Sequence, residues 1–116
     1  MQAIKPPVPL SALDAIDIRV GTVTAVEDVP GSAKLVRLVV SFGDHTRSIL
    51  AGIKKERPAP QELQGRQALF VVNLEPKRMA GALSEGMLFD IGYADGLSTP
   101  ALAVPEFSVP DGTRCG

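Results

Sequence analysis

The chain has very few of the side chains on which most catalytic and metal-binding sites depend. It contains one cysteine, Cys115, and one histidine, His45. A single thiol can form neither an internal disulfide nor a cysteine pair for a metal, and a lone histidine without a second histidine or cysteine does not make a metal site. His45 also follows Gly43 and Asp44 in a turn sequence, where a solvated side chain is expected. We therefore expect no metal, no cofactor and no catalytic residue in this chain.

Motifs of the common enzyme classes are missing as well. Ser84 has a glycine two residues after it but Ala82 two residues before it, so the motif around an esterase nucleophile is incomplete. Gly81 and Gly86 do not lie between a strand and a helix, as a phosphate-cradling loop requires. The sequence therefore favours a protein that is not an enzyme, and an orphan enzyme or small-molecule binder is the least favoured alternative.

The chain also lacks an excess of positive charge and any long apolar run. Twelve Lys and Arg residues against 13 Asp and Glu give a formal net charge of −1, so a nucleic-acid site would have to be a local basic patch on a nearly neutral body. No apolar segment approaches the roughly 18–20 residues that span a bilayer, and residues 1–7 have no apolar signal core. We expect a cytoplasmic protein without membrane contacts.

What the sequence does contain is a succession of short β-type segments. Its 116 residues suit one domain, and 11 Gly with 10 Pro are typical of many strands joined by turns. Apolar alternation and β-branched residues predict strands at 16–26, 35–42, 46–51, 67–73, 83–90 and 99–104. The segment 74–82 is expected to be a loop, and Gly21 is the expected bulge where the first strand bends.

The order of these segments predicts the fold class. Pro60 to Gly65 is expected to form a short helix between the third and fourth strands. An all-β, five-stranded Greek-key barrel with one helix at that place is the oligonucleotide-binding fold, although other small barrels have similar spacing. We expect an extended, proline-rich N-terminal arm at 1–12 and one domain at 13–116, which includes a C-terminal extension at 91–116 with a turn-rich tail at 104–113.

The most informative segment, residues 73–87, is expected to comprise a strand end, a basic loop and the start of the next strand. Lys77 and Arg78 place two adjacent cations in this loop, and cations bind phosphate without reading sequence. Lys34 opens a strand and Arg37 is expected to face outward on the barrel wall. Both would extend the basic surface of the loop.

The same segment contains polar and apolar groups that suit RNA. Asn73 and Ser84 can hydrogen-bond base edges or ribose, while Met79 and Met87 offer polarizable apolar surface against which an unstacked base can pack. Each residue also has an ordinary explanation: asparagines cap turns, methionines in strands belong to cores, and a Lys-Arg pair is often simply solvated. The RNA interpretation rests on their combination.

This combination resembles the signature of the tRNA-binding domain family. The family includes stand-alone bacterial tRNA-binding proteins, CsaA proteins, the C-terminal domains of some methionyl-tRNA synthetases and the endothelial monocyte-activating polypeptide domain. Its pattern of Asn-Leu-x-Pro, a basic pair, Met or Leu, x-Gly and Ser-x-Gly-Met is matched between Asn73 and Met87. Further blocks are similar to the family over about residues 13–116: Asp17–Gly21, Lys34-Leu35, Glu62–Arg66 and Val109–Arg114.

The resemblance implies an oligonucleotide-binding fold that recognises tRNA by shape and, in stand-alone members, a homodimer in which the terminal segments take part. We therefore predict non-catalytic, structure-selective tRNA binding through the basic loop and barrel face, with tRNA as the partner and an aminoacyl-tRNA synthetase acting in trans as a further candidate. A CsaA-type chaperone or secretion-related protein that binds unfolded or precursor polypeptides is the alternative. The sequence departs from the family at Gly31–Ala33, and Glu75 and Glu85 bring negative charge to the predicted site.

Overall fold

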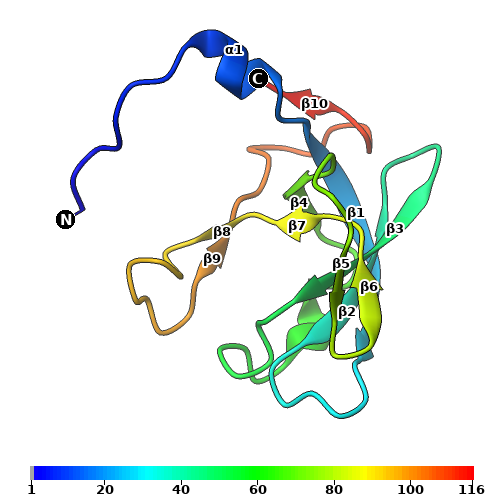
Figure 1. Cartoon of the computed structure of the whole chain (residues 1–116). Helices are drawn as coiled ribbons and strands as arrows, with labels where there is room; N and C mark the ends of the chain where they lie inside the picture. Colours follow the sequence, from blue (N-terminus) through cyan, green and yellow to red (C-terminus); the bar gives the residue numbers. More distant parts are fainter. Residues whose placement is uncertain (1) are drawn as a thin grey trace.

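Five antiparallel strands form a nearly closed barrel, with their alternating apolar side chains on the inside (Figure 1). The computed structural model describes residues 2–116. The strands follow one another in the order β3-β2-β1-β4-β7. Their bounds are β1 (Ile18–Asp28), β2 (Val36–Ser41), β3 (Thr46–Ala51), β4 (Gln67–Val71) and β7 (Met87–Leu88). The predicted oligonucleotide-binding barrel is confirmed, with strand boundaries shifted by a few residues.

The barrel closes where β3 meets residues 84–85. At this seam, side chains as well as the main chain form the hydrogen bonds between the two segments. The Glu85 N–H donates to the Ser48 carbonyl at 2.8 Å, and the Ser48 N–H donates to Glu85 Oε1 at 2.9 Å. The Leu50 N–H donates to Ser84 Oγ at 3.0 Å. The Arg47 guanidinium donates to two carbonyls at this seam, including that of Glu85 at 3.2 Å. The fifth strand of the barrel is therefore the segment that continues from residue 84 into β7.

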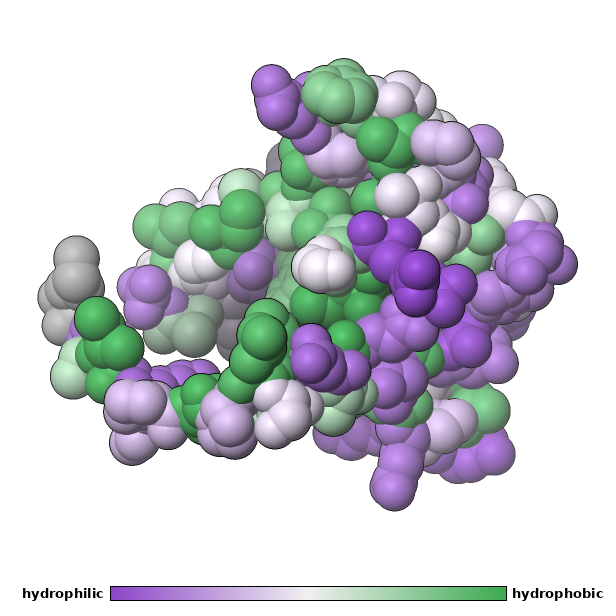
Figure 2. Space-filling model, turned by 90° about the horizontal axis from the view of Figure 1, so that it is seen from above, coloured by the Kyte–Doolittle hydropathy of each residue, from purple (hydrophilic) through white to green (hydrophobic). Residues whose placement is uncertain are grey.

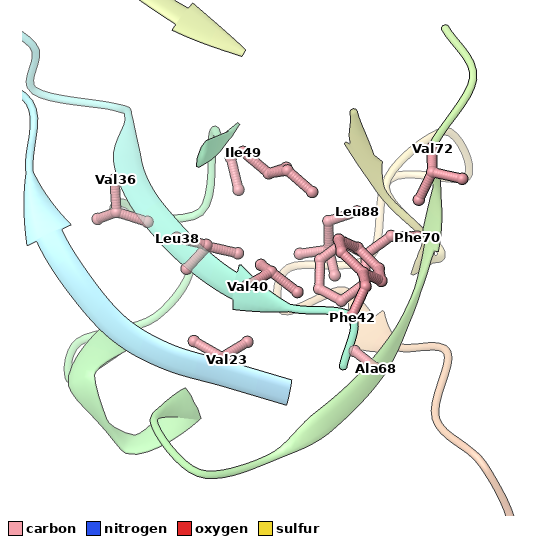
Figure 3. Close-up of a cluster of buried hydrophobic side chains, with 11 residues drawn as sticks. Val23, Val36, Leu38, Val40, Phe42, Ile49, Ala68, Phe70, Val72 and Leu88 are labelled. Atoms are coloured by element: carbon pink, nitrogen blue, oxygen red, sulfur yellow. The ribbon is translucent and has the colours of Figure 1, made fainter. Parts of the chain in front are cut away.

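The inward-facing side chains of the strands form one apolar core (Figure 3). The rings of Phe42 and Phe70 meet edge to face with their centroids 5.7 Å apart, a favoured aromatic geometry. A short 3-10 helix, η1 (Pro60–Leu63), lies between β3 and β4 and adds the fully buried side chain of Leu63. The predicted helix is thus present, although it is shorter than expected.

Gly21 has a different role from the one its position in the sequence indicated. β1 does change its partner from β4 to β2 at Thr22, next to this glycine. The strand thus passes from one partner to the next beside Gly21, as expected, but the register shift between β1 and β2 falls later, between Val23 and Ala25, so no bulge lies at Gly21 itself. A Cβ on Gly21 would lie 2.6 Å from Cγ1 of Val40. Glycine is needed there for close packing rather than for a bulge.

The segment expected to be a basic loop is a hairpin. β5 (Lys77–Met79) pairs with β6 (Ala82–Ser84), and Ala80 and Gly81 connect them with positive φ angles of 49° and 80°. The single strand predicted at 83–90 is divided between β6, β7 and β8 (Asp90–Ile91). Gly86 lies between β6 and β7. The chain passes so close to β4 there that a Cβ on Gly86 would lie 2.9 Å from the Val71 carbonyl oxygen. β8 pairs with β9 (Ala101–Leu102), which falls within the strand predicted at 99–104.

Both termini contain a short regular element. Residues 10–14 form the helix α1 (Leu10–Asp14), although residues 2–9 have no regular structure. Hydrophobic residues line this arm as it extends away from the body (Figure 2). At the other end, β10 (Arg114–Cys115) pairs with the start of β1. Within residues 2–116, no helix is both long and apolar enough to cross a membrane.

Candidate nucleic-acid interface

The β5–β6 hairpin presents the two cations singled out in the sequence. Lys77 and Arg78 are both exposed and, within residues 2–116, neither forms an ion pair. Arg78 is paired across the hairpin with the exposed Leu83, so this pair occupies the outward face. The next cross-strand pair, Met79 and Ala82, points to the opposite face of the hairpin and packs toward the barrel. The hairpin therefore keeps its two positive charges available to a ligand.

A small second core holds this hairpin against the barrel. Val29, Leu35 and Leu50 are buried together, and Met79 and Ala82 of the hairpin pack on them. Burial of apolar surface on one side of a short hairpin fixes its position, which two short strands alone would not do. The two cations thus extend from a supported element rather than from a free loop.

Two of the predicted RNA-binding residues have polar groups that are hydrogen-bonded to distant parts of the chain. Ser84 is only 5% exposed, and its hydroxyl accepts the Leu50 N–H and donates to the Gly86 carbonyl at 3.1 Å. The Asn73 side chain accepts the Asp17 N–H at 2.7 Å and donates to the Ala15 carbonyl at 2.8 Å. These contacts make both residues positioning residues of the fold.

The remaining predicted residues lie on two adjoining surfaces. Lys34 and Met87 line the same groove and are both exposed. Arg37 lies on β2 opposite Leu50, which places it on the outer face of the sheet that the hairpin partly covers. Arg37 forms an ion pair with Glu27 at 3.4 Å, and both side chains are about half exposed. The barrel wall at Arg37 and the groove at Lys34 therefore flank the hairpin.

The groove itself was not predicted from the sequence. It has a volume of about 460 Å³, and Met79, Met87, Lys34, Tyr93 and Glu56 contribute to its walls. Lys34 Nζ lies 5.9 Å from the ring centroid of Tyr93, within range of a cation–π interaction. The segment 91–98 supplies this tyrosine, which is the only one in the sequence. An isolated aromatic residue in a glycine-rich polar link is the one signal that could have indicated it.

The comparisons with known proteins agree with this geometry. Residues 18–114 match the family model described as a putative tRNA binding domain. The chain belongs to the tRNA-binding domain family. A curated methionine–tRNA ligase of Methanothrix thermoacetophila is 45% identical over 112 residues, which are 97% of this chain but 16% of that protein. A second, from Methanocaldococcus jannaschii, is 44% identical over 79 residues, or 68% of this chain and 12% of that protein.

Solved structures place this tRNA-binding domain among proteins of the same size. It is similar to a MetRS-related protein from Pyrococcus horikoshii, with a TM-score of 0.87, 34% identity and coverage of 97% of this chain and 100% of that one. It is also similar to the chaperone CsaA from Bacillus anthracis, with a TM-score of 0.80, 30% identity and coverage of 96% and 100%. The resemblance predicted from the sequence is confirmed, and it supports tRNA binding.

Several other cations of the tRNA-binding domain are engaged in the fold. Arg19 pairs with Asp17 at 2.9 Å, and its hydrogen bond lowers the pKa of the Asp17 carboxyl. Lys54 pairs with Asp28 at 2.9 Å. The Arg47 guanidinium bonds carbonyls at the seam of the barrel. These cations are less available to RNA than the pair on the hairpin.

Groups that could support catalysis are sparse in the part of the tRNA-binding domain that the structure describes. Among residues 2–116, no three or more His, Cys, Asp or Glu side chains lie close enough together to hold a metal ion. Burial raises the pKa of the Cys115 thiol, which leaves less thiolate, the nucleophilic form, at neutral pH. His45 stacks on Phe42 and bonds Asp44 at 2.6 Å, so its ring has local partners.

Proposed function

We propose that this chain is a non-catalytic protein that binds tRNA by its shape, through the β5–β6 hairpin and the surfaces beside it. The observation that carries the proposal is that Lys77 and Arg78, on a hairpin anchored to the barrel, form no ion pair with any of residues 2–116. Two cations that a rigid element holds at a fixed distance from each other recognise the spacing of phosphates rather than base identity. The family match supports tRNA as the RNA concerned.

The other predicted residues take two kinds of role in this proposal. Lys34 and Arg37 extend the cationic surface, because an exposed ion pair such as Arg37–Glu27 is weak enough to exchange its carboxylate for a phosphate. Met87 offers apolar surface to the RNA. Asn73 and Ser84 hold the elements that carry these groups. A body with a net charge of −1 then limits binding outside this local patch.

We also infer a protein partner and a cellular location. The curated relatives carry this domain as a small part of methionine–tRNA ligases. An aminoacyl-tRNA synthetase acting in trans is therefore the partner that the proposal favours, with the chain delivering or retaining tRNA in the cytoplasm.

The chain is expected to form a homodimer through its terminal segments. Ile4 is 98% exposed, and Val8, Leu10 and Leu13 are also exposed on the same arm. Several large apolar side chains close together on a surface mark an interaction site. Sedimentation equilibrium at micromolar concentration should give twice the mass of one chain, and the L10D/L13D variant should give the mass of a monomer. A wild-type monomer at these concentrations would contradict the prediction.

Filter binding with purified total tRNA tests the proposed function directly. We expect tRNA to bind much more tightly than an unstructured RNA of equal length, at both low and moderate salt, because a rigid cationic surface fits one phosphate arrangement. Affinity for both RNAs should fall as salt rises, since phosphate contacts release counterions. Equal or absent binding of both RNAs would overturn the proposal. In that event, an assay for suppression of the aggregation of an unfolded protein would test whether this chain acts as a chaperone, the alternative function.

A further inference from the structure

The groove beside the hairpin has the size and composition of a site for one small flat ligand. Its volume of about 460 Å³ lies within the range of roughly 300–1,000 Å³ that is usual for small-ligand sites. Leu35, Leu50 and Leu88 contribute apolar surface to it, and Lys34 contributes a positive charge. The groove adjoins the cations of the hairpin because Met79, which follows Arg78, forms part of its wall.

Three side chains of the groove suit the face of a nucleobase. Tyr93 is 54% exposed and Met87 is 43% exposed, and both line the groove together with Met79. Bases stack on aromatic rings with a gain of about 1–3 kcal/mol per base, and thioethers pack well against aromatic systems. Aromatic and thioether surfaces that stand exposed next to a cationic hairpin are placed where a base leaving an RNA stack would arrive.

Glu56 gives the groove a hydrogen-bond acceptor without a donor. It contributes to the wall, and its Oε2 atom is buried with no hydrogen-bond partner among residues 2–116. The neighbouring Arg57 does not satisfy it, because that guanidinium bonds the Pro100 carbonyl at 3.1 Å and lies 3.7 Å from Glu62. Buried polar atoms without a partner are rare in native proteins and costly. A ligand N–H group removes this cost when the Glu56 side chain turns its carboxylate toward the groove, because Oε2 itself is buried.

We propose that this groove binds an unstacked guanine of the RNA, with its edge hydrogen-bonded to Glu56. This inference rests on the proposed RNA-binding function. A carboxylate only accepts hydrogen bonds, and the Watson–Crick edge of guanine offers two adjacent donors, the N1–H and the 2-amino group. Each of the other bases offers one donor there, next to an acceptor that would face the carboxylate. Lys34 lies beside Tyr93, where it complements the phosphate attached to the bound nucleoside.

The test uses methyl NMR of the full chain labelled with 13C-methyl methionine. The chain has three methionines, and the resonances of Met79 and Met87 are assigned from single leucine variants. The ligands are the pentanucleotides UUGUU, UUAUU, UUCUU and UUUUU, together with UUIUU, in which inosine lacks the 2-amino group. We expect UUGUU to shift both methyl resonances and to bind about tenfold more tightly than the other four, since a bidentate base contact discriminates by about 1–3 kcal/mol.

Two protein variants locate the selectivity. E56Q replaces one acceptor oxygen by a donor, so the preference for UUGUU over UUUUU should disappear. E106Q removes an equal charge from an exposed residue outside the groove and should keep the preference. The comparison of guanine with inosine uses the wild-type protein, so it stands even if E56Q proves unstable.

Filter binding of total tRNA in parallel separates this inference from the proposed function. If tRNA binds but the methionine resonances do not move, or all pentanucleotides bind equally, the guanine site is wrong and the proposed function stands. If an unfolded polypeptide moves the resonances and no oligonucleotide does, the groove is a peptide site and the inference is overturned. If tRNA itself does not bind, the proposed function fails, and with it the inference.

Discussion

Replacing Lys77 and Arg78 together by glutamine is expected to weaken tRNA binding by about tenfold to thirtyfold at low salt. Each exposed cation–phosphate contact contributes up to about 1 kcal/mol, and 1.4 kcal/mol corresponds to a factor of ten. The slope of log K against log salt should become shallower by about 2, because two phosphate contacts fewer release fewer counterions. Filter binding over a series of salt concentrations measures both quantities.

Two further variants show whether this effect belongs to the hairpin. K5Q/R66Q removes the same amount of charge from exposed residues outside the hairpin and the groove, and it should leave the affinity and the slope nearly unchanged. S84A should behave differently from both, since it leaves the Leu50 N–H without its partner and should cost about 1–3 kcal/mol of stability. An unchanged salt slope in the Lys77 and Arg78 variant would remove the hairpin from the binding site.

Gly112→Ala is expected to destabilise the fold by about 2–5 kcal/mol. Gly112 has a φ angle of +87°, and a Cβ there would lie 2.4 Å from the Phe42 carbonyl oxygen. Left-handed backbone costs a non-glycine residue about 1–2 kcal/mol, and forcing an atom into a packed region adds roughly 1–3 kcal/mol. Urea denaturation measures the loss of unfolding free energy.

Gly31→Ala is the matched control for this variant. Gly31 has a similar φ angle of +79°, but a Cβ there would meet no atom within 4 Å. Its loss should therefore be limited to the backbone contribution of about 1–2 kcal/mol. If both variants lose the same amount, the contact between the C-terminal segment and the β2–β3 turn does not constrain the fold.

The reason Gly112 matters lies in how the C-terminal segment is attached. The Gly112 N–H donates to the Val20 carbonyl at 2.7 Å. The preceding Asp111 accepts hydrogen bonds from Thr22 at 2.7 Å and from Gln67 at 3.0 Å through Oδ1. The extension beyond the barrel is thus bonded to β1 and β4, and it belongs to the folded domain.

The barrel was predictable because its signal is local. Alternation along β1 to β4 is visible within each strand, and Pro60 marks the short helix between β3 and β4. The hairpin was not predictable in the same way, because Lys77, Arg78 and Met79 have no strong β propensity. Packing of Met79 on the small second core decides its conformation, and tertiary context of this kind overrides local propensity.

The site was predictable in its chemistry and not in its geometry. The sequence singled out Asn73 and Ser84 as polar residues near the cations, but their partners Asp17 and Leu50 lie 56 and 34 residues away along the chain. Whether such a side chain faces RNA or holds two strands together depends on those distant partners. Glu56 escaped notice for the same reason, because its burial follows from the closure of the groove.

Tyr93 gives this protein an optical property that follows from its composition. The chain contains no tryptophan and one tyrosine, and that tyrosine lines the groove. Near-ultraviolet emission from the folded protein therefore comes almost entirely from one ring beside Lys34. The unmodified protein reports on this one surface without an attached dye, whereas in most proteins the signal averages over many aromatic residues.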